Sequence, residues 1–195
     1  MGASHPFRHR NYKPRACGGT KTMKVKDLAL ATIFAALYAA LVIALAGISF
    51  QLVQVRVADA LIPLSIIFGW PAVIGVTAGC VISNVVSPLP SVLTDITFGA
   101  IANFFASLVA WRIGNWHRKS AVHPGSFNGF GDSASLFLGS LAAALVVTLV
   151  VGTYLAVITG MELWIWWLGI GVGSLISICG IGFMLLEVLK KIRLK

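Results

Sequence analysis

The sequence predicts an all-α integral membrane protein, a bundle of six membrane-spanning helices with the N and C termini in the cytoplasm. Hydrophobic residues make up 58% of the 195 residues and charged residues only 11%, whereas charged residues are about a quarter of a soluble domain. The apolar residues form stretches long enough to cross a bilayer, and nearly all positive charges lie outside these stretches. We therefore expect a multi-pass protein of the cell membrane.

Four stretches are long enough to cross the membrane as single helices. A helix spans the hydrocarbon core with about 20 apolar residues. The stretches that meet this length are residues 27–47, 92–112, 134–159 and 163–189. They supply the first, fourth, fifth and sixth helices of the predicted bundle.

The second and third helices come from one apolar stretch, residues 57–88. This stretch is too long for a single crossing, and Gly69 and Pro71 interrupt it near its middle. Proline fits the first turn of a helix, and the residue before it is driven away from helical geometry. The sequence therefore predicts a short helix at 57–69, a tight turn and a second helix at 71–87.

The positive charges orient this bundle. Of the 15 Lys and Arg residues, all except Arg56 lie before the first helix, in the segment 112–133 or after the last helix. Positive charges gather on the cytoplasmic side of membrane proteins, so both termini and the segment 112–133 are expected there. Because the net charge of +9 lies at helix ends, it acts as a topology signal, and we expect no nucleic-acid partner.

The chain divides into a short tail and one membrane domain. Residues 1–22 are basic and contain no apolar run, which excludes a secretory signal peptide and predicts a disordered basic tail. Residues 23–195 are expected to form a single six-helix transmembrane domain.

Polar residues gather on the predicted outer side of the membrane. Polar groups so close to hydrocarbon are costly unless they pair or line a wet cavity, so we expect one binding pocket there for a small molecule. The candidate residues are Gln54, Arg56, Asp59, Asn84, Asp95, Glu162 and Trp164. Alternatively, Arg56 reaches towards lipid headgroups, the two aspartates complement helix N-termini, and the tryptophan belongs to an interfacial aromatic belt.

The first predicted helix carries small residues at four-residue spacing. One stripe consists of Ala31, Ala35 and Ala39, and a second consists of Ala36, Ala40 and Ala44. Such stripes allow another helix to approach closely in lipid. We assign Ala31, Ala35 and Ala39 to a partner interface, with packing inside the same bundle as the alternative.

Catalytic motifs are missing from the sequence. It contains no HExxH, GxSxG or P-loop pattern, and no CxxC pair, each of which would indicate hydrolysis, nucleotide binding or a metal site. We therefore expect a protein that binds without catalysing a reaction, and that needs no metal or cofactor.

Three motifs resemble one family of transporters. They are Gln54, Arg56, Asp59, Ala60 and Leu61, then Gly79, Cys80 and Asn84, then Asp95, Phe98 and Gly99. Together they resemble the QueT (queuosine-precursor transporter) family, whose members are substrate-binding S components of energy-coupling factor (ECF) transporters. The resemblance covers residues 24–112 well. Further on, the family has an asparagine in the fifth helix and a Gly-Glu pair in the sixth, where this chain has Ala142–Ala144 and Gly173-Ser174.

This resemblance implies an S-component-like bundle with a ligand pocket near its outer face. It also implies partners, namely a transmembrane coupling subunit that meets the alanine stripe and a pair of cytoplasmic ATPases. The implied substrate is a 7-deazaguanine precursor of queuosine or archaeosine. Three alternatives remain: an S component for another vitamin-like molecule, an integral membrane enzyme that uses the outer carboxylates, and a structural or assembly protein.

Overall fold

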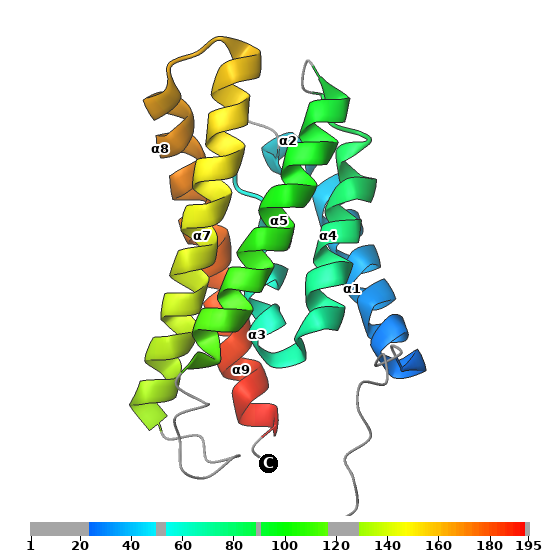
Figure 1. The fold of residues 1–195 in the computed structure, drawn as a ribbon, viewed down its shortest axis with the longest axis vertical. Coiled ribbons are helices and arrows are strands. Elements are labelled where there is room, and N and C mark those ends of the chain that lie inside the picture. Colours follow the sequence, from blue (N-terminus) through cyan, green and yellow to red (C-terminus); the bar gives the residue numbers. More distant parts are fainter. Residues whose placement is uncertain (1–23, 50–53, 89–90, 117–128, 194–195) are drawn as a thin grey trace, which may run out of the picture.

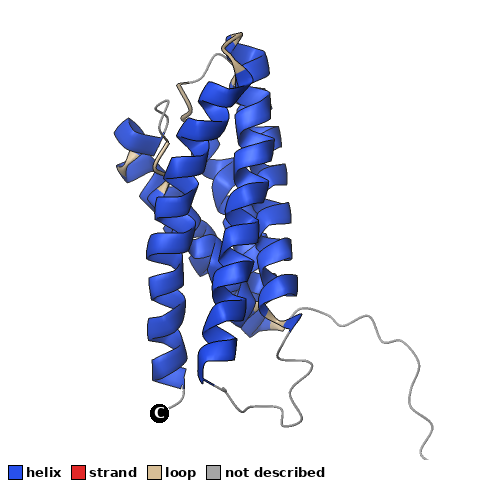
Figure 2. Cartoon of the chain, turned by 90° about the vertical axis from the view of Figure 1, so that its left-hand side faces the viewer, coloured by secondary structure: helices blue, strands red, loops and turns tan. Residues whose placement is uncertain are grey.

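The computed structural model describes residues 24–49, 54–88, 91–116 and 129–193, and within them the chain forms helices and no strands (Figures 1 and 2). The predicted tail at 1–22 lies outside the described residues. In chain order the elements are α1 (Val25–Ala44), α2 (Ala46–Ser49), the 3₁₀ helix η1 (Val57–Leu64), α3 (Ser65–Phe68), α4 (Trp70–Asn84), α5 (Val92–Gly114), α7 (Gly129–Thr159), α8 (Leu163–Ser174), the π-helical stretch η2 (Leu175–Gly182) and α9 (Phe183–Arg193).

Four helical segments of the described chain are long and apolar enough to cross a membrane. They are Val25–Ala44, Val92–Gly114, Ser133–Thr159 and Leu163–Ile192, which confirms the four long stretches predicted from the sequence. Two shorter apolar helices, Val57–Phe68 and Trp70–Asn84, lie where the second and third helices were expected. That these two also cross, completing six spans, stays a prediction.

The predicted turn between the two short helices is confirmed. Gly69 adopts φ 67° and ψ −140°, a conformation that is inexpensive only for glycine because it has no Cβ. Pro71 follows in the first turn of α4, where its missing N–H leaves no hydrogen bond unmade. The chain therefore reverses direction between α3 and α4.

Three predicted helices are less regular than expected. The first ends at Ala44, because Leu45 leaves helical geometry with φ −109° and ψ 27°, and α2 follows as a separate turn. The second begins as η1 and becomes α-helical only at Ser65. The sixth changes to π geometry at Leu175 and continues to Arg193, and such π stretches often occur at functional sites.

The helices pack around η1. In space α1 lies against α4, α5 lies between α4 and α7, and α7 lies against α8, while η1 packs against η2 (Figure 1). Every residue of η1 after Val57 is buried. We name the end of the bundle near Thr159 and Leu163 the outer end, following the predicted topology, and the opposite end the inner end.

Of the two alanine stripes, the first packs inside the bundle. A Cβ added at Gly75 of α4 would lie 2.5 Å from the carbonyl oxygen of Ala31, and one at Gly79 would lie 2.7 Å from that of Ala35. The backbones of α1 and α4 are therefore in close contact, and Ala39 is also buried. The stripe assigned to a partner is thus occupied by α4 of the same chain. The second stripe, Ala36, Ala40 and Ala44, is exposed.

Candidate functional site

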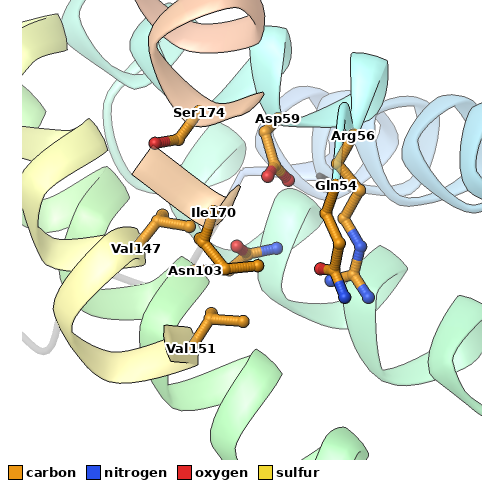
Figure 3. A pocket seen from close by; sticks show the side chains of 8 residues that line it. All are labelled: Gln54, Arg56, Asp59, Asn103, Val147, Val151, Ile170 and Ser174. Carbon is orange, nitrogen blue, oxygen red and sulfur yellow. The ribbon is translucent and has the colours of Figure 1, made fainter. Parts of the chain in front are cut away.

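A small polar cavity lies between η1, α5, α7 and α8 (Figure 3). The volume of this cavity is about 10 Å³, which is room for about one water molecule. Its lining residues are Gln54, Arg56, Asp59, Asn103, Val147, Val151, Ile170 and Ser174. Three of the residues predicted from the sequence are among them, and the polar lining is contributed by three separate segments, residues 54–59, α5 and α8.

Asp59 is held by a chain of hydrogen bonds that crosses the bundle. The hydroxyl of Tyr38 in α1 donates to Oδ1 of Asp59 at 2.6 Å. Asn103 of α5 in turn donates from Nδ2 to the Tyr38 oxygen at 2.8 Å. All three side chains are at most 5% exposed. Since each is tied to the next in a low-dielectric interior, the carboxylate is fixed in one orientation towards the cavity.

The backbone of residues 54–56 packs closely against α8, and this packing brings the side chains of Gln54 and Arg56 to the cavity. A Cβ added at Gly173 would lie 1.8 Å from the carbonyl oxygen of Gln54, so only glycine permits this contact. The guanidinium of Arg56 attracts the Asp59 carboxylate electrostatically. The Nε2 atom of Gln54 is buried and has no hydrogen-bond partner among the described residues.

A second polar cluster lies nearer the outer end. Asn84 of α4 donates from Nδ2 to the backbone oxygen of Asp95 at 2.9 Å. The hydroxyl of Tyr154 in α7 donates to the Asp95 side chain at Oδ1. Phe98 stacks on the Tyr154 ring with 5.3 Å between centroids. Gly99 leaves room for the Asn84 amide, because a Cβ there would lie 2.5 Å from Nδ2.

The cavity lies deep in the bundle. Asn103 is eight residues after Asp95 on α5, which places it about 12 Å further from the outer end at about 1.5 Å per residue. The expectation from the resemblance was a pocket near the outer face. The site lies deeper because the chain at 54–56 already runs inside the bundle, against Gly173.

Two of the predicted site residues have a different place from the one expected. Glu162 is exposed at the N-terminus of α8. Trp164 is 61% exposed. Neither lines the cavity. On the same turns of α8 it is Trp166 that is buried, and it donates from Nε1 to Thr159 at 2.9 Å. Glu162 and Trp164 lie on the exposed side of this helix end, apart from the other candidates.

The sequence reasoning missed three residues that organise the site. These are Tyr38, Asn103 and Tyr154, which hold the two aspartates. Each is a polar group inside an otherwise apolar helix, a placement that is costly in a membrane and that marks functional positions. That signal could have identified them. The apolar lining residues Val147, Val151 and Ile170 carry no comparable signal.

The arrangement is suited to recognition of a small polar molecule. Carboxylate oxygens, an amide donor and a guanidinium converge on one buried space, and such convergence of a few polar groups in an apolar surround is typical of ligand sites. In the part of the chain that the structure describes, no three His, Cys, Asp or Glu side chains gather as metal ligands.

Comparison with known proteins places the chain in a family. No curated protein and no solved structure matches it. The sequence model of one family, described as QueT transporter, matches residues 28–191, which is nearly the whole chain and includes both polar clusters as well as α7 to α9, where the resemblance noted from the sequence was weaker. Together with the membrane-spanning helices, this match identifies a multi-pass membrane protein of transport function that belongs to the QueT transporter family.

Proposed function

We propose that the protein is the substrate-binding subunit of an uptake system for a 7-deazaguanine precursor of queuosine or archaeosine. The observation that carries this proposal is the buried cavity in which Gln54, Arg56, Asp59 and Asn103 converge inside a QueT-family bundle. A membrane bundle keeps such buried polar groups for a ligand or for transport, since they are costly otherwise.

The hydrogen-bonding groups of the cavity are complementary to a guanine-like edge. That edge presents an N–H and an amino group as donors and a carbonyl oxygen as acceptor. Asp59 supplies carboxylate oxygens for the donors, and Nε2 of Gln54, which has no partner among the described residues, supplies a donor for the carbonyl oxygen together with Arg56. Hydrogen bonds of this kind to charged groups contribute about 1.5–3 kcal/mol each.

Binding requires the cavity to enlarge. Room for about one water is too little for a two-ring base, so the segments that line the cavity must move apart when the ligand binds. One of the contacts on this side of the cavity is the close backbone approach of Gly173 in α8 to Gln54. A ligand that inserts between these segments forms hydrogen bonds with the buried polar groups of the cavity. The contacts that it breaks are mainly van der Waals contacts.

Energy for uptake is proposed to come from ECF partner subunits, a transmembrane coupling subunit and a pair of ATPases. Two stripes of α1 are candidates for the contact. The stripe first assigned to the partner, Ala31, Ala35 and Ala39, faces α4, so a partner reaches it only by displacing α4. Ala36, Ala40 and Ala44 are exposed and are open to a partner helix without rearrangement, and we propose this second stripe as the interface.

Calorimetry on the detergent-solubilised protein tests the proposal. We expect tight binding of 7-cyano-7-deazaguanine or its aminomethyl analogue, weaker binding of guanine and none of riboflavin. Binding of riboflavin alone would indicate an S component for another vitamin-like molecule. Chemical conversion of a bound deazaguanine would indicate an enzyme.

A further inference from the structure

An apolar groove lies at the inner end of the bundle, between the end of α3 and α9. Its volume is about 530 Å³, against about 10 Å³ for the polar cavity. The residues that line it are Ile67, Phe68, Leu189 and Ile192. Since all four side chains are apolar, they offer no hydrogen bond to a polar ligand. The groove therefore calls for an occupant of a different kind from that of the polar cavity.

The groove lies where two helices diverge. Phe68 packs against Phe34 of α1 with 5.3 Å between the ring centroids, so α3 stays close to α1. In contrast, α9 packs against η1, η2 and α7. The inner ends of α1 and α9 accordingly lie apart in Figure 1, with α3 between them. Ile192 is 66% exposed, so the described chain leaves this wall of the groove uncovered.

Aromatic and basic residues indicate that the groove lies at the level of the inner lipid headgroups. Trp70 directly follows the turn at Gly69, and its ring centroid is 5.8 Å from that of Trp111. The guanidinium of Arg112 lies over the Trp111 ring at 5.7 Å. Tryptophan is enriched at the boundary between headgroups and hydrocarbon, and Arg and Lys on its cytoplasmic side. Because α3 ends directly before this turn, the groove opens where the acyl chains of the inner leaflet begin.

A positive charge lies beside the groove. Leu189 and Ile192 of α9 line it, and Lys191, between them in the chain, is exposed. Lys190 instead is buried and donates to Ser133 of α7 at 3.2 Å. Lys191 forms no ion pair within the described chain. An apolar surface and a cation without a described counter-ion thus lie next to each other at the membrane boundary.

We propose that this groove binds an acyl chain of an anionic phospholipid of the inner leaflet, and that the negative headgroup of this lipid pairs with Lys191. An acyl chain has no hydrogen-bonding group, so four apolar side chains suit it. Basic residues at the membrane surface attract anionic headgroups, which gives the site its preference among lipids. The groove is separate from the polar cavity, so this inference does not depend on the ligand of that cavity.

Photo-crosslinking of the full-length, detergent-solubilised protein tests the inference. The probe is phosphatidylglycerol with a photoreactive diazirine in one acyl chain, and mass spectrometry of peptides locates the labelled residues. We expect saturable labelling within 65–68 and 185–192. Unlabelled phosphatidylglycerol should compete at about fivefold lower concentration than phosphatidylcholine with the same acyl chains, the effect of one basic residue near anionic headgroups.

Two pairs of variants separate the groove from the rest of the surface. Ile192→Trp fills the groove from its exposed wall, so labelling should be lost. Val188→Trp is the matched control and should be labelled as the wild type is, because Val188 is 54% exposed on the same helix and does not line the groove. Lys191→Gln should remove the preference for phosphatidylglycerol. Lys24→Gln removes a charge from the inner end of α1 and should keep it.

Three results would overturn the inference. The first is equal competition by the two lipids in the wild type, a comparison that does not depend on any variant. The second is an equal effect of Ile192→Trp and Val188→Trp on labelling. The third is labelling that no unlabelled lipid competes but that added coupling subunits block, since the groove would then belong to a protein partner.

Discussion

Asp59 supplies the carboxylate of the cavity. It is the last acceptor in a chain of hydrogen bonds that runs from Asn103 of α5 through Tyr38 of α1, so its carboxylate is both buried and oriented. The first of the three motifs noted in the sequence, QVRVADAL at residues 54–61, places Arg56 and Asp59 three residues apart, and both side chains line the cavity (Figure 3).

Replacement of this carboxylate tests its proposed contact with the ligand. Asp59→Asn keeps an oxygen to accept from Tyr38 but removes the charge, so we expect the dissociation constant for a deazaguanine to rise about 10- to 100-fold. Calorimetry on folded variant protein measures the change. Asp27→Asn, at the inner end of α1, serves as control. An unchanged dissociation constant would mean that the ligand does not contact Asp59.

Tyr38 does not line the cavity but donates a hydrogen bond to Asp59, so we expect it to affect ligand binding through Asp59. Tyr38→Phe removes the donor to that carboxylate and leaves Nδ2 of Asn103 without its acceptor. A buried polar group without a partner costs about 1–3 kcal/mol, so the variant should unfold at a lower temperature and bind the ligand more weakly. Thermal unfolding with and without ligand measures both effects. Wild-type values for both would contradict the positioning role.

Among the helices, α8 positions residues 54–56 through a close backbone contact. Gly173→Ala places a Cβ where 1.8 Å separates it from the Gln54 carbonyl oxygen, so residues 54–56 must shift. We expect lower thermal stability and a weakened ligand affinity. Gly171→Ala is a matched control in the same helix, since its Cβ would meet Thr148 at an ordinary 3.5 Å. Equal effects of the two substitutions would show that helix flexibility, and not the contact, is responsible.

Substitutions in the two alanine stripes of α1 are expected to have opposite effects. Ala39→Leu enlarges a side chain that is 7% exposed on the face packed against α4, so overpacking should cost about 1–3 kcal/mol of stability. Ala40→Leu lies on the exposed stripe and should leave stability and ligand binding unchanged while uptake with the coupling subunits is lost. Thermal unfolding, binding and cellular uptake of the two variants distinguish these faces. Full uptake by the Ala40→Leu variant would show that the second stripe is not the interface with the coupling subunit.

For the whole molecule, the distribution of positive charge predicts the orientation in the membrane. Met161 and Trp116 are exposed residues at opposite ends of the bundle. In a variant without native cysteines, Met161→Cys should react with a membrane-impermeant maleimide on intact cells, and Trp116→Cys only after permeabilisation. Labelling of the Trp116→Cys variant on intact cells would show that the orientation is opposite to the predicted one.

The class of the protein, its four long helices and the reversal at Gly69 could all be predicted from the amino-acid sequence. These follow from local properties, because composition, apolar length and the backbone preferences of glycine and proline act within a few residues. It also identified Gln54, Arg56 and Asp59, because isolated polar residues stand out in an apolar chain.

Which helix faces turn inward, and which polar groups meet, depends on how the helices pack against one another. Tyr38 and Asp59 are 21 residues apart and Asn103 and Tyr38 are 65 apart, and no local pattern links them. A membrane helix is apolar on all sides, so periodicity does not reveal its buried face. For this reason the packing of Ala31, Ala35 and Ala39 against α4, the outward positions of Glu162 and Trp164, and the depth of the cavity emerged only when the helices were assembled.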